Sequence, residues 1–157
     1  MNYFVKTTIL IASLTYASLN IAYAGTCDLS IEATAQMAYT AKELAVPKTC
    51  KEITLNFKAA GTMGKAVMGH NVVISKTSDM QAVITDGITA GLAKNYVKPN
   101  DTRVIGHTIV IGGGEATSVK VNLSNLKPED SYSFYCSFPG HGSVMKGVLK
   151  FVWFFFQ

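Results

Sequence analysis

The stretch EITLNFKA, residues 52–59, alternates apolar and polar side chains along most of its length. Its apolar residues Ile53, Leu55 and Phe57 stand at every second position. Because successive side chains of a β-strand point to opposite faces of a sheet, these three would share one buried face. The stretch therefore predicts a strand in a sheet that is buried on one side and exposed on the other.

Several other short stretches, rich in β-branched or alternating apolar residues, lie on either side of it. Clusters of Gly, Pro, Asn and Asp separate most of them, which is typical of strands joined by turns. This pattern predicts an all-β protein, a Greek-key β-sandwich or barrel of the cupredoxin-like kind. The expected strands cover residues 27–33, 52–59, 71–75, 103–112, 117–123, 131–136 and 147–153.

One segment, around residues 79–92, departs from the strand pattern. Its apolar residues Met80, Val83 and Ile84 have helical spacing. The two glycines within the segment favour a helix that is short or irregular. We therefore expect one short helical insertion between the strands.

The first 24 residues read as a secretory signal peptide. Lys6 is their only charged residue, an apolar stretch follows it, and a small-x-small cleavage site ends at Ala24. A membrane anchor is the rival interpretation, but several polar residues interrupt the apolar run. We expect residues 1–24 to be removed on export to the periplasm, leaving residues 25–157 as a single domain.

The charge of the chain gives no sign of a nucleic-acid partner. The formal net charge is +4, and it falls only to +3 when Lys6 leaves with the signal peptide. No basic run and no interleaving of basic and aromatic residues is present. The mature chain also has no stretch that predicts a transmembrane helix.

The three cysteines are Cys27, Cys50 and Cys136. Disulfides persist in the oxidising compartment that an exported protein enters. A bond between Cys27 and Cys50 would stabilise the fold by about 3 kcal/mol and would leave Cys136 as a free thiol whose role needs an explanation. Lipidation of Cys27 is a rival, but Thr26 precedes it where a lipid-attachment site has Gly or Ala, so we favour the disulfide.

The sequence YCSFPGHGSVMKG, residues 135–147, carries Cys136, His141 and Met145 on one turn between two expected strands. A thiolate, an imidazole and a thioether are soft ligands, which select copper over magnesium or calcium. Each residue alone is more often a packing or surface residue, but their joint spacing on a Gly- and Pro-rich turn makes that interpretation weak. One more nitrogen would complete a trigonal His₂Cys site with a weak methionine ligand.

Two histidines outside this turn, His70 and His107, are candidates for that nitrogen. His70 directly precedes an expected strand, whereas His107 lies inside one. A ligand is better placed at a strand end, so we choose His70 and expect His107 to be an ordinary surface histidine. Zinc is the rival metal, but structural zinc sites take four Cys or His donors, and the methionine favours copper.

Longer stretches around these residues carry a resemblance to a known family. They are VMGHN (67–71), DMQAVITDG (79–87), YVKPND (96–101), RVIGHT (103–108) and YCSFPGHGSVMKG (135–147), together with the Cys27 and Cys50 pair. With them the chain resembles the azurins, bacterial type 1 (blue) copper proteins of the cupredoxin family, over about residues 27 to 150. The resemblance implies an electron carrier with one copper ion per chain, and not an enzyme.

The resemblance also implies how the copper is held. Met145 would be a distant axial ligand, with the Gly69 carbonyl opposite it. Asn71 would tie the two ligand segments together by hydrogen bonds near the thiolate, and Cys27–Cys50 would be the disulfide. The in-plane ligands would be His70, Cys136 and His141.

A docking surface is implied around His141. Its partners would be redox proteins, such as a c-type cytochrome or a periplasmic reductase, that make brief contacts burying less than about 1,200 Å². The apolar surface would consist of Met37, Met68, Ile88 and Phe138.

The chain departs from the azurin pattern in three places. Val72 replaces a buried tryptophan of the family, and Ala59 lies near the place of a histidine linked to pH-dependent behaviour. The chain also continues past Lys150 into an aromatic tail, residues 151–157, which is too short to span a bilayer. The tail could cover a partner or membrane surface, but we expect it to extend the packing of the last strand.

Two other functions compete with the electron carrier. A periplasmic copper-binding or buffering protein without a redox partner would have the same site in its sequence. A copper oxidase or nitrite-reducing enzyme is disfavoured, because the chain has no histidines left for a second copper ion.

Overall fold

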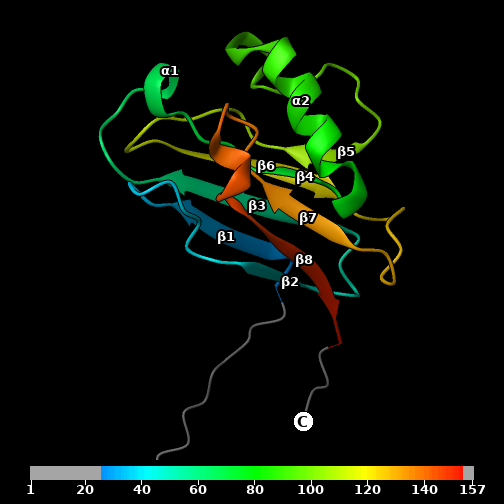
Figure 1. Ribbon diagram of the computed structural model, residues 1–157. Helices are drawn as coiled ribbons and strands as arrows, with labels where there is room; N and C mark the ends of the chain where they lie inside the picture. Colours follow the sequence, from blue (N-terminus) through cyan, green and yellow to red (C-terminus); the bar gives the residue numbers. More distant parts are fainter. Residues whose placement is uncertain (1–25, 154–157) are drawn as a thin grey trace, which may run out of the picture.

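A computed structural model describes residues 26–153 of the chain, which form two packed β-sheets (Figure 1). The first sheet has the strand order β1 (Asp28–Ala33), β3 (Glu52–Ala59), β6 (Ala116–Asn122). The second has the order β2 (Glu43–Pro47), β8 (Lys146–Val152), β7 (Tyr132–Tyr135), β4 (Val73–Lys76), β5 (Val104–His107). The predicted all-β sandwich is confirmed.

Between β1 and β3 the chain passes through the second sheet as β2, so the strand pairs include both parallel and antiparallel ones. β1 runs parallel to β3, and β2 runs parallel to β8, whereas the remaining neighbours are antiparallel. Parallel neighbours need a crossover between them, and here β2 makes that crossover through the opposite sheet.

The core lies between the sheets. Ile53, Leu55 and Phe57 of β3 are buried with exposed fractions of 2% or less, as their alternation predicts. They belong to the same apolar cluster as Ile74 of β4 and Phe134 of β7. Burial of one such side chain stabilises the fold by about 1.5–3 kcal/mol.

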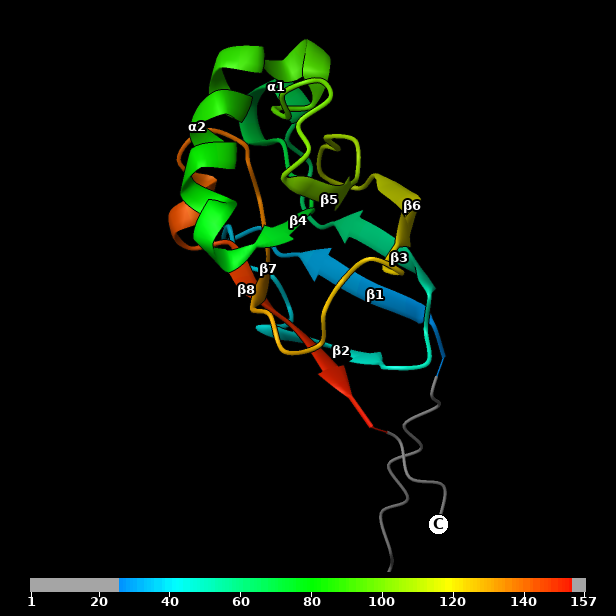
Figure 2. The same ribbon diagram turned by 90° about the vertical axis from the view of Figure 1, so that its right-hand side faces the viewer.

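The helix α2 (Met80–Ala90) confirms the helical insertion predicted around residues 79–92. It covers the outer face of the second sheet (Figure 2). Val83 of the helix belongs to a separate apolar cluster with Val73 of β4 and Tyr135 of β7. The second sheet is therefore buried on both faces where the helix covers it.

The structure adds elements that the sequence did not predict and shortens others. The strand β2 and the short helix α1 (Lys65–Met68) are new, and the strand expected over 103–112 is reduced to β5. Three 3₁₀ turns complete the described elements: η1 (Thr77–Asp79), η2 (Leu92–Lys94) and η3 (His141–Ser143).

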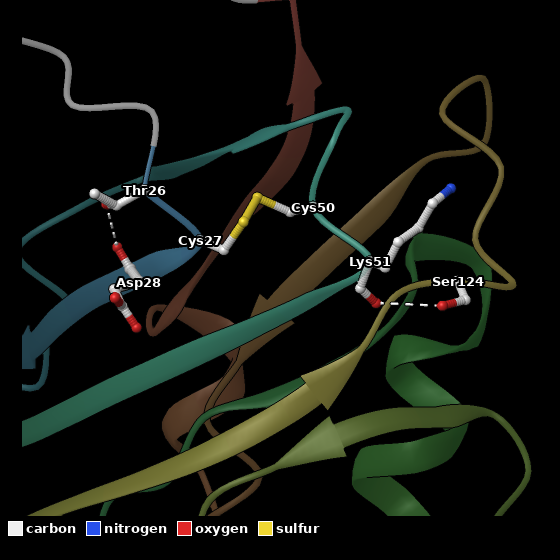
Figure 3. The surroundings of a disulfide bond; sticks show 6 residues. All are labelled: Thr26, Cys27, Asp28, Cys50, Lys51 and Ser124. Carbon is white, nitrogen blue, oxygen red and sulfur yellow. Dashed lines mark hydrogen bonds between the residues drawn. A yellow bond between two sulfur atoms is a disulfide. The ribbon is translucent and has the colours of Figure 1, made fainter.

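The disulfide between Cys27 and Cys50 is present, with 5.7 Å between the two Cα atoms (Figure 3). Cys27 directly precedes β1, and its carbonyl accepts a hydrogen bond from the backbone N–H of Thr54. Beside Cys50, the Lys51 carbonyl accepts a hydrogen bond from Oγ of Ser124. The disulfide thus joins the starts of two neighbouring strands and leaves Cys136 as a free, buried cysteine.

The first residues of the aromatic tail belong to the sandwich. Phe151 pairs with Val46 of β2, and its ring packs edge-on against Tyr132 at a centroid distance of 6.0 Å. Trp153 is exposed, and the ammonium of Lys48 lies 4.5 Å from the centre of its ring. The tail therefore begins as an extension of β8.

The signal peptide predicted over residues 1–24, and residues 154–157 at the end of the predicted tail, lie outside the described residues. Within residues 26–153, no helix has both the length and the apolar character needed to cross a bilayer.

The turn that follows β7 and the helix α1 lie toward one end of the sandwich. The start of β1 and the end of β8 lie toward the other end (Figure 1). All the candidate ligands from the sequence come from segments near the first of these ends.

Candidate metal centre

His70 is held in place by the segment that follows α1. Its backbone N–H and carbonyl exchange two hydrogen bonds of 2.9 Å with Ile111. The preceding Gly69 is tightly packed, because a Cβ there would lie 2.4 Å from the Lys65 carbonyl oxygen and 2.8 Å from the Phe138 ring. Only glycine fits, so this residue lets the chain approach the turn after β7 closely.

Cys136, His141 and Met145 lie on that turn, which backbone hydrogen bonds close into a compact loop. The N–H of Cys136 donates to the Met145 carbonyl at 3.0 Å, and the N–H of Met145 donates to the His141 carbonyl at 2.8 Å. Gly140 adopts a left-handed φ of 82°, which favours glycine. The three candidate donors therefore sit on one rigid connection.

The structure brings three of the predicted ligands together. Nδ1 of His70 lies 3.2 Å from Nδ1 of His141, which lies 3.8 Å from Sγ of Cys136. The donor atoms of these residues all lie within 4.8 Å of one another. The exposed fractions are 1% for His70, 0% for Cys136 and 5% for His141, so the cluster is shielded from solvent.

Burial sets the protonation states of the metal-free cluster. It lowers the pKa of His70 to about 4, with a further contribution from the nearby His141, and it also lowers the pKa of His141. Burial raises the pKa of Cys136 to about 11, although the backbone N–H groups of Asn71 and Phe138 oppose this rise. At neutral pH the cluster therefore holds two neutral imidazoles and one protonated thiol.

The donor spacing fits a single metal ion. With metal–nitrogen bonds of about 2.0 Å and metal–sulfur bonds of about 2.3 Å, trigonal donors lie about 3.5 Å (N to N) and about 3.7 Å (N to S) apart. The observed distances are 3.2 Å between the two Nδ1 atoms and 3.8 Å between Nδ1 of His141 and Sγ of Cys136. Two nitrogens and a thiolate are a donor set that copper accepts.

The remaining predicted metal residues, Met145 and Gly69, are joined to the cluster through the backbone, and Met145 is hydrogen-bonded there to Cys136 and His141. Met145 is fully buried, and Gly69 directly precedes His70. His107 is half-buried in β5, where its Nδ1 lies 3.0 Å from the Thr108 carbonyl oxygen, and it is not part of the cluster.

Asn71 links the two segments that carry the cluster. Its Oδ1 accepts a hydrogen bond from the N–H of Ser137, and its Nδ2 donates to Oγ of Ser137, both at 2.9 Å. Nδ2 also donates to the carbonyl of Asn95, at 2.9 Å. The neighbour of His70 is thus fixed to the neighbour of Cys136 and to a third loop.

Sequence reasoning missed three residues of this network: Tyr39, Asn95 and Ser137. Tyr39 donates a hydrogen bond from its hydroxyl to the Asn71 carbonyl. Ser137 lies next to Cys136, so its position in the ligand turn could have identified it from the sequence. Asn95 contributes a backbone carbonyl, for which its residue type gives no signal.

The predicted docking residues differ in exposure. Met37 and Ile88 are 37% and 45% exposed, and Met68 is partly exposed. Phe138 is buried at 8%, with its ring centre 4.6 Å from that of His141, so it packs against the histidine and adds little to the surface. Val144, on the ligand turn itself, is 51% exposed and was not predicted.

The comparisons with known proteins all identify the same family. Residues 25–152 match the family described as copper binding proteins, plastocyanin/azurin family. The chain is 56% identical over 124 residues to an azurin of Alcaligenes faecalis, covering 79% of this chain and 97% of that protein. It is 51% identical over 137 residues to an azurin of Achromobacter denitrificans, covering 87% and 91% respectively.

A solved structure is similar as well. It is the azurin Az-iso2 from the obligate methylotroph Methylomonas sp. strain J, with a TM-score of 0.77 and 43% sequence identity. The similarity covers 80% of this chain and 98% of that one.

Proposed function

Because the chain belongs to the plastocyanin/azurin family of copper-binding proteins, we propose that it is a periplasmic electron carrier with one type 1 copper ion, and not an enzyme. The observation that carries this proposal is the buried cluster of one thiol and two imidazoles within 4.8 Å. Met145 and the Gly69 carbonyl would hold the copper ion more weakly. The three principal ligands would be His70, Cys136 and His141.

A bound copper ion supplies a one-electron change between Cu(I) and Cu(II). The contribution of the chain is to keep the donor atoms in place during that change. The backbone hydrogen bonds between Cys136, Met145 and His141 fix the turn, and Asn71 fixes the turn to the His70 segment. Donors that move little between the two oxidation states keep the barrier to electron transfer low.

His141 is the ligand through which we expect the electron to leave. It lies on the turn at one end of the sandwich and retains an exposed fraction of 5%. Exposed Met37 and Ile88 would form part of an apolar surface on which a partner docks briefly. A c-type cytochrome or a periplasmic reductase fits this description.

The disulfide supports export to an oxidising compartment. Together with the signal peptide predicted over residues 1–24, it favours the periplasm.

The copper site is tested by adding Cu(II) to the purified metal-free protein and recording its visible spectrum. We expect an intense thiolate-to-Cu(II) band in the wild type and none in Cys136→Ser, whose metal-free form should keep its fold. Persistence of the band in Cys136→Ser would show that the ligand assignment is wrong.

The carrier function is tested by mixing the copper-loaded protein with a small c-type cytochrome and following electron exchange by stopped-flow absorbance. Fast exchange is the expected result. A protein that shows the band but exchanges electrons too slowly to follow would instead be a copper-buffering protein.

A further inference from the structure

Tyr39 reaches the metal cluster from the core, although it lies far from the ligands in sequence. Its hydroxyl donates a hydrogen bond of 2.5 Å to the carbonyl of Asn71, the residue after His70. Burial, with a smaller contribution from Cys136, raises the pKa of Tyr39 well above its ordinary value, so the hydroxyl keeps its proton and acts as a donor.

The Tyr39 ring is itself firmly held. It is 4% exposed, and its centroid lies 6.2 Å from that of Phe57 and 5.5 Å from that of Phe134. Phe57 belongs to the first sheet and Phe134 to the second. The ring that carries the hydroxyl is therefore fixed between the two sheets.

Asn71 joins the His70 segment to the ligand turn. Its side chain is bound to Ser137, the residue after Cys136, and to Asn95. Its carbonyl belongs to the peptide group whose N–H, that of Val72, donates to Oγ1 of Thr108. The main chain of Asn71 is thus held by the Tyr39 hydroxyl at its carbonyl and by Thr108 at the next N–H.

We propose that Tyr39 is a positioning residue of the copper centre, which fixes the main chain of Asn71 and, through the side chain of Asn71, its link to Ser137 beside Cys136. The redox part of this proposal rests on the proposed function. Groups that orient the ligands of a metal tune the properties of the metal they hold. Loss of the Tyr39 hydroxyl therefore loosens the ligand segments and shifts the reduction potential.

Tyr39 does not act as an electron relay. A phenol that gives up an electron also gives up its proton, and the group that faces its hydroxyl is the backbone carbonyl of Asn71, which is not a base. The hydroxyl acts through geometry alone.

The test compares Tyr39→Phe with Tyr132→Phe in the full protein. Tyr39→Phe keeps the ring that packs on Phe57 and Phe134 and removes only the hydroxyl. Tyr132 is the matched control, because it is buried in the same core and its hydroxyl accepts a hydrogen bond from the backbone N–H of Lys127, away from the cluster.

Two measurements are made on each variant. In the metal-free protein, hydrogen exchange at the Val72 amide, which shares a peptide group with the Asn71 carbonyl, should become on the order of tenfold faster in Tyr39→Phe and stay unchanged in Tyr132→Phe. In the copper-loaded protein, redox titration should give a changed potential in Tyr39→Phe alone.

Each outcome decides the proposal. Unchanged amide exchange together with an unchanged potential would overturn it, as would equal effects of the two variants, because both results describe a purely structural hydroxyl. If the wild type binds no copper, the proposed function fails, yet the Val72 exchange rate in the metal-free chain still decides whether Tyr39 positions Asn71.

Discussion

Asn71 and Ser137 hold each other by two hydrogen bonds of 2.9 Å across 66 positions of sequence. The N–H of Ser137 donates to Oδ1 of Asn71, and Nδ2 of Asn71 donates back to Oγ of Ser137. Each residue directly follows a candidate ligand, His70 in one case and Cys136 in the other. The link therefore fixes how far apart the two ligand segments stand before any metal binds.

Asn71→Ala should loosen the cluster. It removes partners from buried polar groups, so the metal-free protein should lose about 1–3 kcal/mol of stability in urea unfolding. Copper affinity should fall by about tenfold or more. Asn56→Ala, on the exposed face of β3, is the control and should change stability by less than about 0.5 kcal/mol. Equal losses in the two variants would contradict the linking role.

Met145→Leu should keep both the fold and the copper. The exchange conserves volume at a fully buried position and should cost less than about 1.5 kcal/mol. It removes a weak donor that favours Cu(II), so redox titration should give a higher potential. Met37→Leu, at an exposed position, should leave the potential unchanged. An unchanged or lower potential in Met145→Leu would rule out an axial role for this methionine.

Copper binding should release about one proton per chain between pH 7 and pH 9. The pKa values of His70 and His141 are lowered, so both rings are already neutral in this range. The pKa of Cys136 is raised to about 11, so its thiol still carries the proton that the metal displaces. Calorimetry in buffers of different ionisation enthalpy measures this release. A release that falls toward zero by pH 9 would mean that the thiol ionises earlier.

Truncation after Lys150 should destabilise the protein. It removes the pairing of Phe151 with Val46 and the packing of the Phe151 ring on Tyr132, at a cost of about 1–3 kcal/mol. Truncation after Trp153 keeps both contacts and serves as the control. Thermal unfolding of the two proteins makes the comparison, and equal midpoints would exclude a packing role for the start of the tail.

Much of the fold could be predicted from local patterns in the sequence. Period-two alternation located β3, where Ile53, Leu55 and Phe57 fill the core. β2 was missed because it is a short edge strand that ends at Pro47, and its pairing with β8 is parallel and distant in sequence. The expected strand over 103–112 was too long, because Val110 and Ile111 are buried in the core outside β5, and Ile111 pairs only in an isolated bridge with His70.

The residues of the site likewise fall into those that local sequence predicts and those that depend on distant packing. The spacing of Cys136, His141 and Met145 is local, so the turn itself could be read from the sequence. The contributions of Tyr39 and Asn95 depend on how distant loops pack against Asn71, and Asn95 offers only a backbone carbonyl that any residue would offer. Phe138 was expected on the surface, but it is buried, with its ring packed against that of His141.

The start of β1 and the end of β8 lie at the end of the sandwich away from the ligand turn (Figure 1). A tether fused at either of these strand ends would therefore leave the ligand turn at the free end of the sandwich. Attached in this orientation to an electrode or to another redox module, the protein would exchange electrons through its free end, with no need to re-engineer its loops.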